Sequence, residues 1–232
     1  SLLRGDLVIF NSNFTFNLYN QELNKSDNYC IIHRGIDLKY FKSNSRATNS
    51  NTKYIFLPGR PSSIKGHITL LKFFHKFLLS SKIIKYKLLL ISSHESSEEK
   101  RIDNLINNLK LNNNIKFVKP TFNIKKLYEQ SHIVVSLSSR PEGFGRTVAE
   151  SLSFSRPIIS TNLGGTREQL IKFDKNLLFE LDSYDSFKIA LNYVENNYDF
   201  ITKKSREFVK KYYCSENMCI KTLDAYIKLL NN

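Results

Sequence analysis

The sequence predicts an α/β fold in which a parallel sheet carries helices on both faces. Short apolar runs alternate along the chain with amphipathic segments, the order that parallel strands with crossover helices produce. The chain has 232 residues, 41% of them hydrophobic, which is enough to bury a large core. A glycine-containing turn at residues 141–145 lies between an apolar run and a predicted helix, as expected for a strand-to-helix unit.

Six short apolar runs are the predicted strands: Tyr54–Leu57, Lys87–Ile91, Ile115–Val118, Ile133–Leu137, Pro157–Ser160 and Leu177–Phe179. Two sets of apolar residues recur at helical spacing and each predict one buried helix face. They are Leu70, Leu71, Phe74, Phe77 and Leu78, and then Ile102, Leu105, Ile106 and Leu109. Further helices are predicted over Thr121–Gln130, Arg146–Phe154, Thr166–Phe173, Tyr184–Asn196 and Ser215–Leu230.

The turn before residue 146 carries the clearest chemical signal. If a helix begins there, the amides of Phe144, Gly145 and Arg146 are free in its first turn, where the helix dipole favours a phosphate. Two carboxylates, Glu142 and Glu150, flank these amides. Carboxylates accept hydrogen bonds from hydroxyl groups, and a vicinal diol offers two to one carboxylate. The predicted ligand therefore has phosphates flanked by sugars.

With these residues in place, the chain resembles the retaining glycosyltransferases of the GT-B fold, in particular family 4, or glycosyl transferases group 1. Four segments carry the resemblance in the family's order along the chain. They are the Gly-Arg and Lys-Gly loop within Leu57–Gly66, the E-x7-E motif from Glu142 to Glu150, Gly164–Glu168, and Ile32–Asp37 with Phe41. The resemblance implies that the predicted sheet is the Rossmann-like, C-terminal half of a GT-B fold, which binds the donor.

The resemblance also implies a role for each site residue. Arg60 and Lys65 would bind the donor diphosphate, and the arginine fork suits bidentate contact with phosphate. The other assignments are Glu142 and Gly143 for the transferred sugar, backbone amides of Phe144, Gly145, Arg146 and Thr147 for the phosphates, Glu150 for the ribose, and Val118 and Lys119 for the base. The alternative for Glu150 is a surface ion pair with Arg146 at i, i+4.

A GT-B enzyme has two Rossmann-like domains, and the sequence accounts for the second plus the last elements of the first. We expect residues 1–45 to be the end of an N-terminal acceptor domain with its link, residues 46–213 the donor domain, and residues 214–232 a helix that crosses back. The polar tract Ser43–Lys53 is the predicted linker. The missing N-terminal domain is expected in cis or in trans, in a fragment, a truncated gene product or a split enzyme.

The implied reaction moves a hexosyl-type group from a UDP-, GDP- or ADP-sugar to a glycan or lipid-linked acceptor with retention, in cell-envelope polysaccharide or lipopolysaccharide synthesis. This makes the chain a member of the EC 2.4 class, inactive if the N-terminal domain is absent. No cofactor and no metal are expected, because no paired aspartates are spaced to bind a diphosphate-bound cation. Two alternatives remain: a non-catalytic nucleotide-sugar-binding module, or a basic protein that binds membranes or nucleic acid.

The net charge of +14 favours anionic partners by long-range attraction, yet the lysines are scattered along the chain. The densest basic stretch is Lys203–Arg206 with Lys210 and Lys211, a candidate for peripheral contact with an anionic membrane, whereas nucleic acid is not expected. Three cysteines form no closed disulfide framework and suggest a cytoplasmic location, at most peripheral on the inner membrane face.

Two deviations from the family pattern concern the nucleotide. Ser92-Ser93 replaces a glycine turn after the second strand, and Lys119-Pro120 replaces a glycine after the third. His67 follows the Lys65-Gly66 pair and His132 precedes a predicted strand, which makes both candidates for a catalytic base near the cleft; the alternative is that they are structural or exposed, as isolated histidines mostly are.

Overall fold

The computed structural model describes residues 5–23, 28–42, 52–80 and 86–231. Most of the predicted linker Ser43–Lys53 lies outside these residues; its last residue, Lys53, opens the first strand of the large sheet.

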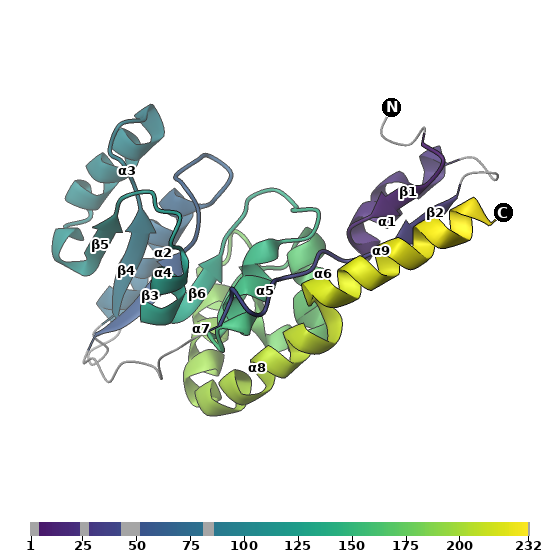
Figure 1. Ribbon diagram of the computed structural model, residues 1–232. Helices are drawn as coiled ribbons and strands as arrows, with labels where there is room; N and C mark the ends of the chain where they lie inside the picture. Colours follow the sequence, from purple (N-terminus) through teal and green to yellow (C-terminus); the bar gives the residue numbers. More distant parts are fainter. Residues whose placement is uncertain (1–4, 24–27, 43–51, 81–85, 232) are drawn as a thin grey trace.

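The large sheet has six parallel strands, as the alternation of apolar runs predicts (Figure 1). Their order across the sheet is β5-β4-β3-β6-β7-β8. In chain order they are β3 (Lys53–Leu57), β4 (Tyr86–Ile91), β5 (Ile115–Val118), β6 (Ser131–Ser136), β7 (Ile158–Thr161) and β8 (Leu178–Phe179). The direction of winding reverses between β3 and β6, and doubly wound sheets bind ligands outside the carboxyl ends of strands at such a reversal.

Helices cover both faces of this sheet and bury its central strands as continuous apolar runs. The helices are α2 (His67–Ser80), α3 (Ser97–Asn108), α4 (Lys125–Gln130), α5 (Arg146–Ser153), α6 (Gly164–Phe173), α7 (Tyr184–Asn196) and α8 (Tyr198–Tyr212), with 3-10 turns at Asn112–Asn114 and Lys175–Leu177; a further 3-10 turn, Asn20–Glu22, follows the first helix of the chain. The helix predicted from Thr121 begins only at Lys125. Its first residues form a turn instead, in which the Asn123 amide donates to the Thr121 hydroxyl at 3.0 Å.

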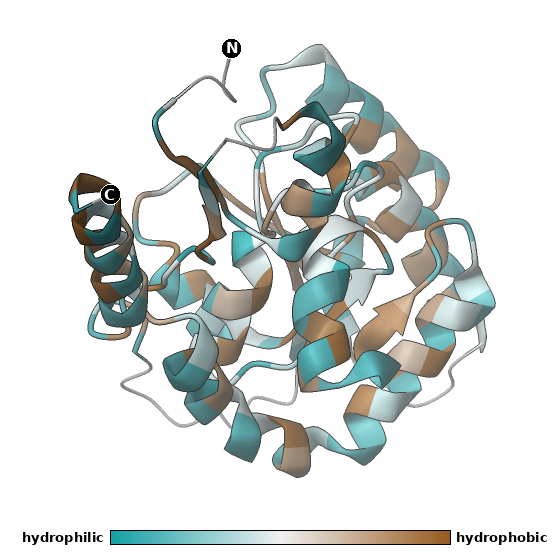
Figure 2. Cartoon of the chain, turned by 90° about the vertical axis from the view of Figure 1, so that its right-hand side faces the viewer, coloured by the Kyte–Doolittle hydropathy of each residue, from teal (hydrophilic) through white to brown (hydrophobic). Residues whose placement is uncertain are grey.

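A second, smaller unit contains the first and the last elements that the structure describes (Figure 1). It consists of β1 (Val8–Phe10), α1 (Asn13–Tyr19) and β2 (Tyr29–Ile31), with β1 and β2 paired in parallel. The final helix α9 (Ser215–Leu230) runs alongside these strands. None of the described residues of α9 is fully buried, and Figure 2 shows hydrophobic (brown) and hydrophilic (teal) residues interspersed along the helix.

The two units are joined where the chain passes between them twice. Ile36 forms a parallel bridge with Cys214, the Ile36 amide donates to the Tyr213 carbonyl at 2.7 Å, and the Ser215 amide donates to the Ile36 carbonyl at 3.0 Å. The two chain segments approach so closely at Gly35 that a Cβ there would lie 2.4 Å from the Ser215 Cα. A side chain at position 35 is therefore excluded.

The predicted basic patch is partly used inside the fold. The Arg206 guanidinium donates to the carbonyls of Leu38, Phe41 and Ser153 at 2.6–2.7 Å. Lys204 contacts Asp174 at 3.3 Å, and these two cations are thus engaged by the protein itself.

Candidate functional site

Two loops meet at the carboxyl ends of β3 and β6, where the sheet reverses. Lys65, in the loop after β3, places its Nζ 2.7 Å from Oε1 of Glu142, in the loop after β6. The backbones also meet, since the Ser139 amide donates to the Ile64 carbonyl at 2.8 Å. Gly66 has a φ of 73°, and a Cβ there would lie 2.0 Å from the Leu137 carbonyl oxygen. Only glycine fits this junction, which brings together two of the predicted site residues.

The Gly-Gly turn that opens α6 packs against the same loop from the other side. The Gly165 amide donates to the Glu142 carbonyl at 2.8 Å. A Cβ on Gly165 would lie 2.5 Å from the Gly143 carbonyl oxygen, and one on Gly164 would lie 2.6 Å from the Glu142 carbonyl oxygen. The paired glycines therefore let one backbone rest directly on another.

The turn leads into α5, whose first amides have no acceptor among the described residues. Gly145 precedes α5 in the left-handed conformation, with a φ of 77° and no side-chain cap. Within the described parts of the chain, the amides of residues 143–147 donate to no acceptor. Free amides at a helix N-terminus attract anions, as the sequence predicts here.

Glu150 lies one turn into α5, with its side chain 15% exposed. Its Oε2 accepts from the Tyr128 hydroxyl at 2.8 Å, and its Oε1 lies 3.0 Å from Arg146. The ion pair with Arg146 is thus present. Burial, and then the nearby Glu150 carboxylate, raise the pKa of Tyr128 well above its ordinary value, so its hydroxyl is a donor. Two donors hold the carboxylate, which still has lone pairs for hydroxyl groups.

Three other predicted site residues, Arg60, Val118 and Lys119, lie at the same edge of the sheet. None of them contacts Glu142. Arg60 is exposed in the loop after β3 and makes no hydrogen bond or ion pair with the described residues. Val118 ends β5 and is half-buried, and Lys119 after it is exposed. The Val118 carbonyl accepts from the Ser92 amide at 3.0 Å. β5 is separated from β3 by β4, so a ligand reaching both loops must extend across three strands.

A buried carboxylate, Glu99, organises the loop where serines replace the glycine turn. It accepts from the Ser92 hydroxyl at 2.9 Å and from the amides of Ser93 and Ser96 at 2.8 and 2.9 Å. Burial opposes its ionisation, but these hydrogen bonds prevail and hold the pKa of Glu99 well below 4.5. The capping-box spacing of Ser96 and Glu99 is visible in the sequence, although the serine contacts are not.

Glu168, the last residue of the Gly-Gly motif segment, joins α6 to the smaller unit. Its carboxylate lies 2.7 Å from His33 Nε2 and accepts from the amides of Asn13 and Phe14 at 3.2 and 2.9 Å. It also accepts from the Asn13 side chain at 2.6 Å. Burial opposes ionisation, but the hydrogen bonds, led by that from His33, lower the pKa of Glu168 to about 2.

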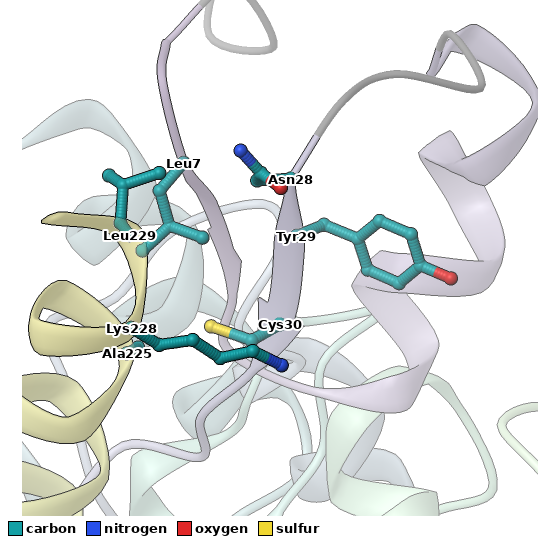
Figure 3. A pocket seen from close by; sticks show the side chains of 7 residues that line it. All are labelled: Leu7, Asn28, Tyr29, Cys30, Ala225, Lys228 and Leu229. Atoms are coloured by element: carbon teal, nitrogen blue, oxygen red, sulfur yellow. The ribbon is translucent and has the colours of Figure 1, made fainter. Parts of the chain in front are cut away.

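A small cavity lies elsewhere, between the smaller sheet and α9. Leu7, Tyr29 and Cys30 line one side, and Ala225, Lys228 and Leu229 line the other (Figure 3). None of the predicted site residues borders it. Among the described residues no cluster of histidine, cysteine or acidic side chains could hold a metal ion, and no helix is long and apolar enough to cross a membrane.

The chain matches a known protein family over most of its length. The family described as "Glycosyl transferases group 1" matches residues 39–213. An uncharacterized glycosyltransferase of Haemophilus influenzae is 29% identical over 164 residues, which are 69% of this chain and 45% of that protein. The chain thus spans about half the length of this curated relative.

Solved structures share the fold. A glycosyltransferase from Rickettsia africae superimposes with a TM-score of 0.86 and 27% identity, over 99% of this chain and 65% of that one. HepE from Anabaena, solved with UDP and glucose, superimposes with a TM-score of 0.80 and 18% identity, over 96% of this chain and 63% of that one. At that identity the HepE likeness shows the fold alone.

Proposed function

Because the chain belongs to the glycosyl transferases group 1 family, we propose that it binds a nucleotide-diphosphate sugar and is the donor half of a retaining glycosyltransferase. The observation that carries the proposal is the Lys65–Glu142 contact of 2.7 Å at the sheet reversal. It brings a cation suited to phosphate beside a carboxylate suited to sugar hydroxyls, next to free helix amides. HepE, a protein of the same fold, was solved with UDP and glucose.

In this proposal the diphosphate lies against the α5 amides, between Lys65 and Arg60. Negative charge builds on the diphosphate as the glycosidic bond breaks, and the amides and cations stabilise that charge. Glu142 and Gly143 contact the transferred sugar, and Lys65 holds the Glu142 carboxylate in place from the phosphate side. In the same proposal, another domain binds the acceptor that receives the sugar.

Glu150 binds the ribose hydroxyls in this arrangement, and the loop from Val118 to Lys119 faces the base. The carboxylate of Glu150 is already oriented by Tyr128 and Arg146, so its remaining lone pairs have a defined direction. A preoriented acceptor loses less side-chain entropy when the nucleotide binds.

The test is calorimetry with UDP, GDP and ADP and their sugars on the wild type, Arg60→Ala and Glu150→Ala. We expect one nucleotide to bind, and each variant to bind it about tenfold to a hundredfold more weakly, because each loses charge-assisted hydrogen bonds. Arg101→Ala is the control, since Arg101 is also an exposed arginine but pairs with Glu98 on α3. Equal affinity of all four proteins would refute the site.

A further inference from the structure

Four successive carbonyl groups in the turn before α5 are each held by a donor from outside that turn. The Glu142 carbonyl accepts from the Gly165 amide and the Gly143 carbonyl from the Ser12 hydroxyl, while the carbonyls of Phe144 and Gly145 both accept from the side-chain nitrogen of Gln169. No residue of the turn supplies any of these donors. The orientation of the turn is therefore imposed by its surroundings.

Holding a carbonyl also directs the next amide. A trans peptide unit is planar, and its N–H points opposite to its C=O. Gln169 approaches two neighbouring peptide units, those joining Phe144 to Gly145 and Gly145 to Arg146. The amides of Gly145 and Arg146 consequently point away from Gln169. These two belong to the amides that donate to no acceptor within the described residues.

Packing alone does not account for a glutamine at position 169. The residue is 1% exposed, and its Nε2 lies 3.1 Å from the Gly145 carbonyl oxygen and 3.4 Å from that of Gly165. Its Oε1 is buried and has no hydrogen-bond partner among the described residues. An unpaired buried oxygen destabilises the fold, whereas an apolar side chain of similar size would fill the space without that penalty.

We propose that Gln169 is a positioning residue that directs the amides of Gly145 and Arg146 toward the diphosphate of the donor. This inference rests on the proposed function, because it presumes that the diphosphate binds at α5. Gln169 touches neither the ligand nor the reacting atoms. It fixes the carbonyl ends of two peptide units, and the amide ends of the same units contact the diphosphate. Its loss therefore weakens phosphate binding but leaves Arg60 and Lys65 in place.

The experiment measures the affinity of inorganic pyrophosphate and of UDP by calorimetry. Gln169→Met keeps the volume but removes the donor, and we expect about tenfold weaker binding of pyrophosphate. Gln169→Glu places a carboxyl group against two carbonyl oxygens, where burial disfavours its ionised form and raises its pKa. Lowering the pH protonates it and restores one donor, so the ratio of variant to wild-type affinity should rise as the pH falls. A purely structural role predicts no such pH dependence of the ratio.

Ser205→Ala is the matched control. Ser205 is fully buried in α8 and donates to the Ile201 carbonyl at 2.7 Å, so its variant loses a buried hydrogen bond remote from the turn. We expect lower stability and unchanged affinity. If folded Gln169→Met binds pyrophosphate as tightly as the wild type, the inference is wrong; if that variant does not fold, the pH dependence of Gln169→Glu decides. A wild type that binds neither pyrophosphate nor any nucleoside diphosphate overturns the proposed function and this inference together.

Discussion

His67 is buried at the first position of α2, and neither of its ring nitrogens has a partner among the described residues. Burial, and then the nearby Lys65 cation, lower the pKa of His67 from 6.5 to about 4. As the pH falls from 6.5 toward 4, the unfolded chain takes up a proton that the folded chain refuses. This histidine therefore makes the fold less stable at mildly acidic pH.

Replacing it with an apolar residue should remove that loss. We expect His67→Leu to be at least as stable as the wild type near pH 8, and its advantage to grow by up to roughly 3 kcal/mol as the pH falls to 4. Urea unfolding at several pH values measures the difference. His75→Leu on the same helix is the control, because His75 is only half-buried. A parallel pH dependence of His67→Leu and the wild type would contradict the assignment.

Residue roles that depend on local spacing could be predicted, and those that depend on distant contacts could not. The E-x7-E carboxylates and the Lys-Gly loop are visible as patterns, and Lys65 does lie beside Glu142. Gln169 has no local signature, because the carbonyls that it contacts are about twenty-five residues away along the chain. Ser12 contacts Gly143 over an even longer separation. The proposed functions of all these residues stay predictions.

At the scale of elements, periodicity located helices and strands well. The predicted helices Tyr184–Asn196 and Ser215–Leu230 agree with α7 and α9, and the strand Ile115–Val118 agrees with β5. The strand predicted at Ile133–Leu137 runs instead from Ser131 to Ser136, because Ser131 pairs with Tyr54. Pairing partners decide where a strand begins, and the local pattern does not contain them.

The attachment of α9 gives a prediction at this scale. A Cβ at position 35 would overlap the Ser215 backbone, so Gly35→Ala must push the start of α9 away from the link. We expect a loss of about 1–3 kcal/mol in the free energy of unfolding, measured with urea. Gly5→Ala is a suitable comparison, since its nearest atom would lie at an ordinary 3.5 Å. Equal losses in both variants would show that the close approach is unimportant.

At the scale of the whole molecule, Glu168 connects the two units. It receives hydrogen bonds from the first residues of α1 and from His33, and all of these donors belong to the smaller unit or to the segment that follows it. A carboxylate at a helix N-terminus is also favoured by the helix dipole. Ser12, the residue before α1, donates to the Gly143 carbonyl, so the attachment of α1 to the large unit also reaches the candidate site.

We predict that Glu168→Gln loosens this attachment. A neutral amide accepts weaker hydrogen bonds than a carboxylate, and we expect about 1–3 kcal/mol lower stability near neutral pH. Because the pKa of Glu168 is lowered to about 2, its contribution is full above pH 4.5 and disappears as the pH falls through 2. The gap between wild type and variant should close over that range.

Hydrogen exchange at α1 supplies the measurement that separates attachment from general stability. Amides of α1 should exchange faster in Glu168→Gln, while those of β3 and β4 keep their protection. Glu180→Gln is the control, since Glu180 is exposed and accepts from Asn162 at 2.9 Å within the large unit. Unchanged exchange in α1 would refute the role given to Glu168.

The bridge between Ile36 and Cys214 has a consequence for how the polypeptide folds. It pairs two residues that lie far apart in sequence, so it cannot form until Cys214 has been synthesised. Contacts of such long sequence separation require closure of a large loop, and they form slowly. The Rossmann-like sheet, whose neighbouring strands are mostly close in sequence, is expected to form first, and α9 then fastens the unit of β1, α1 and β2 to it.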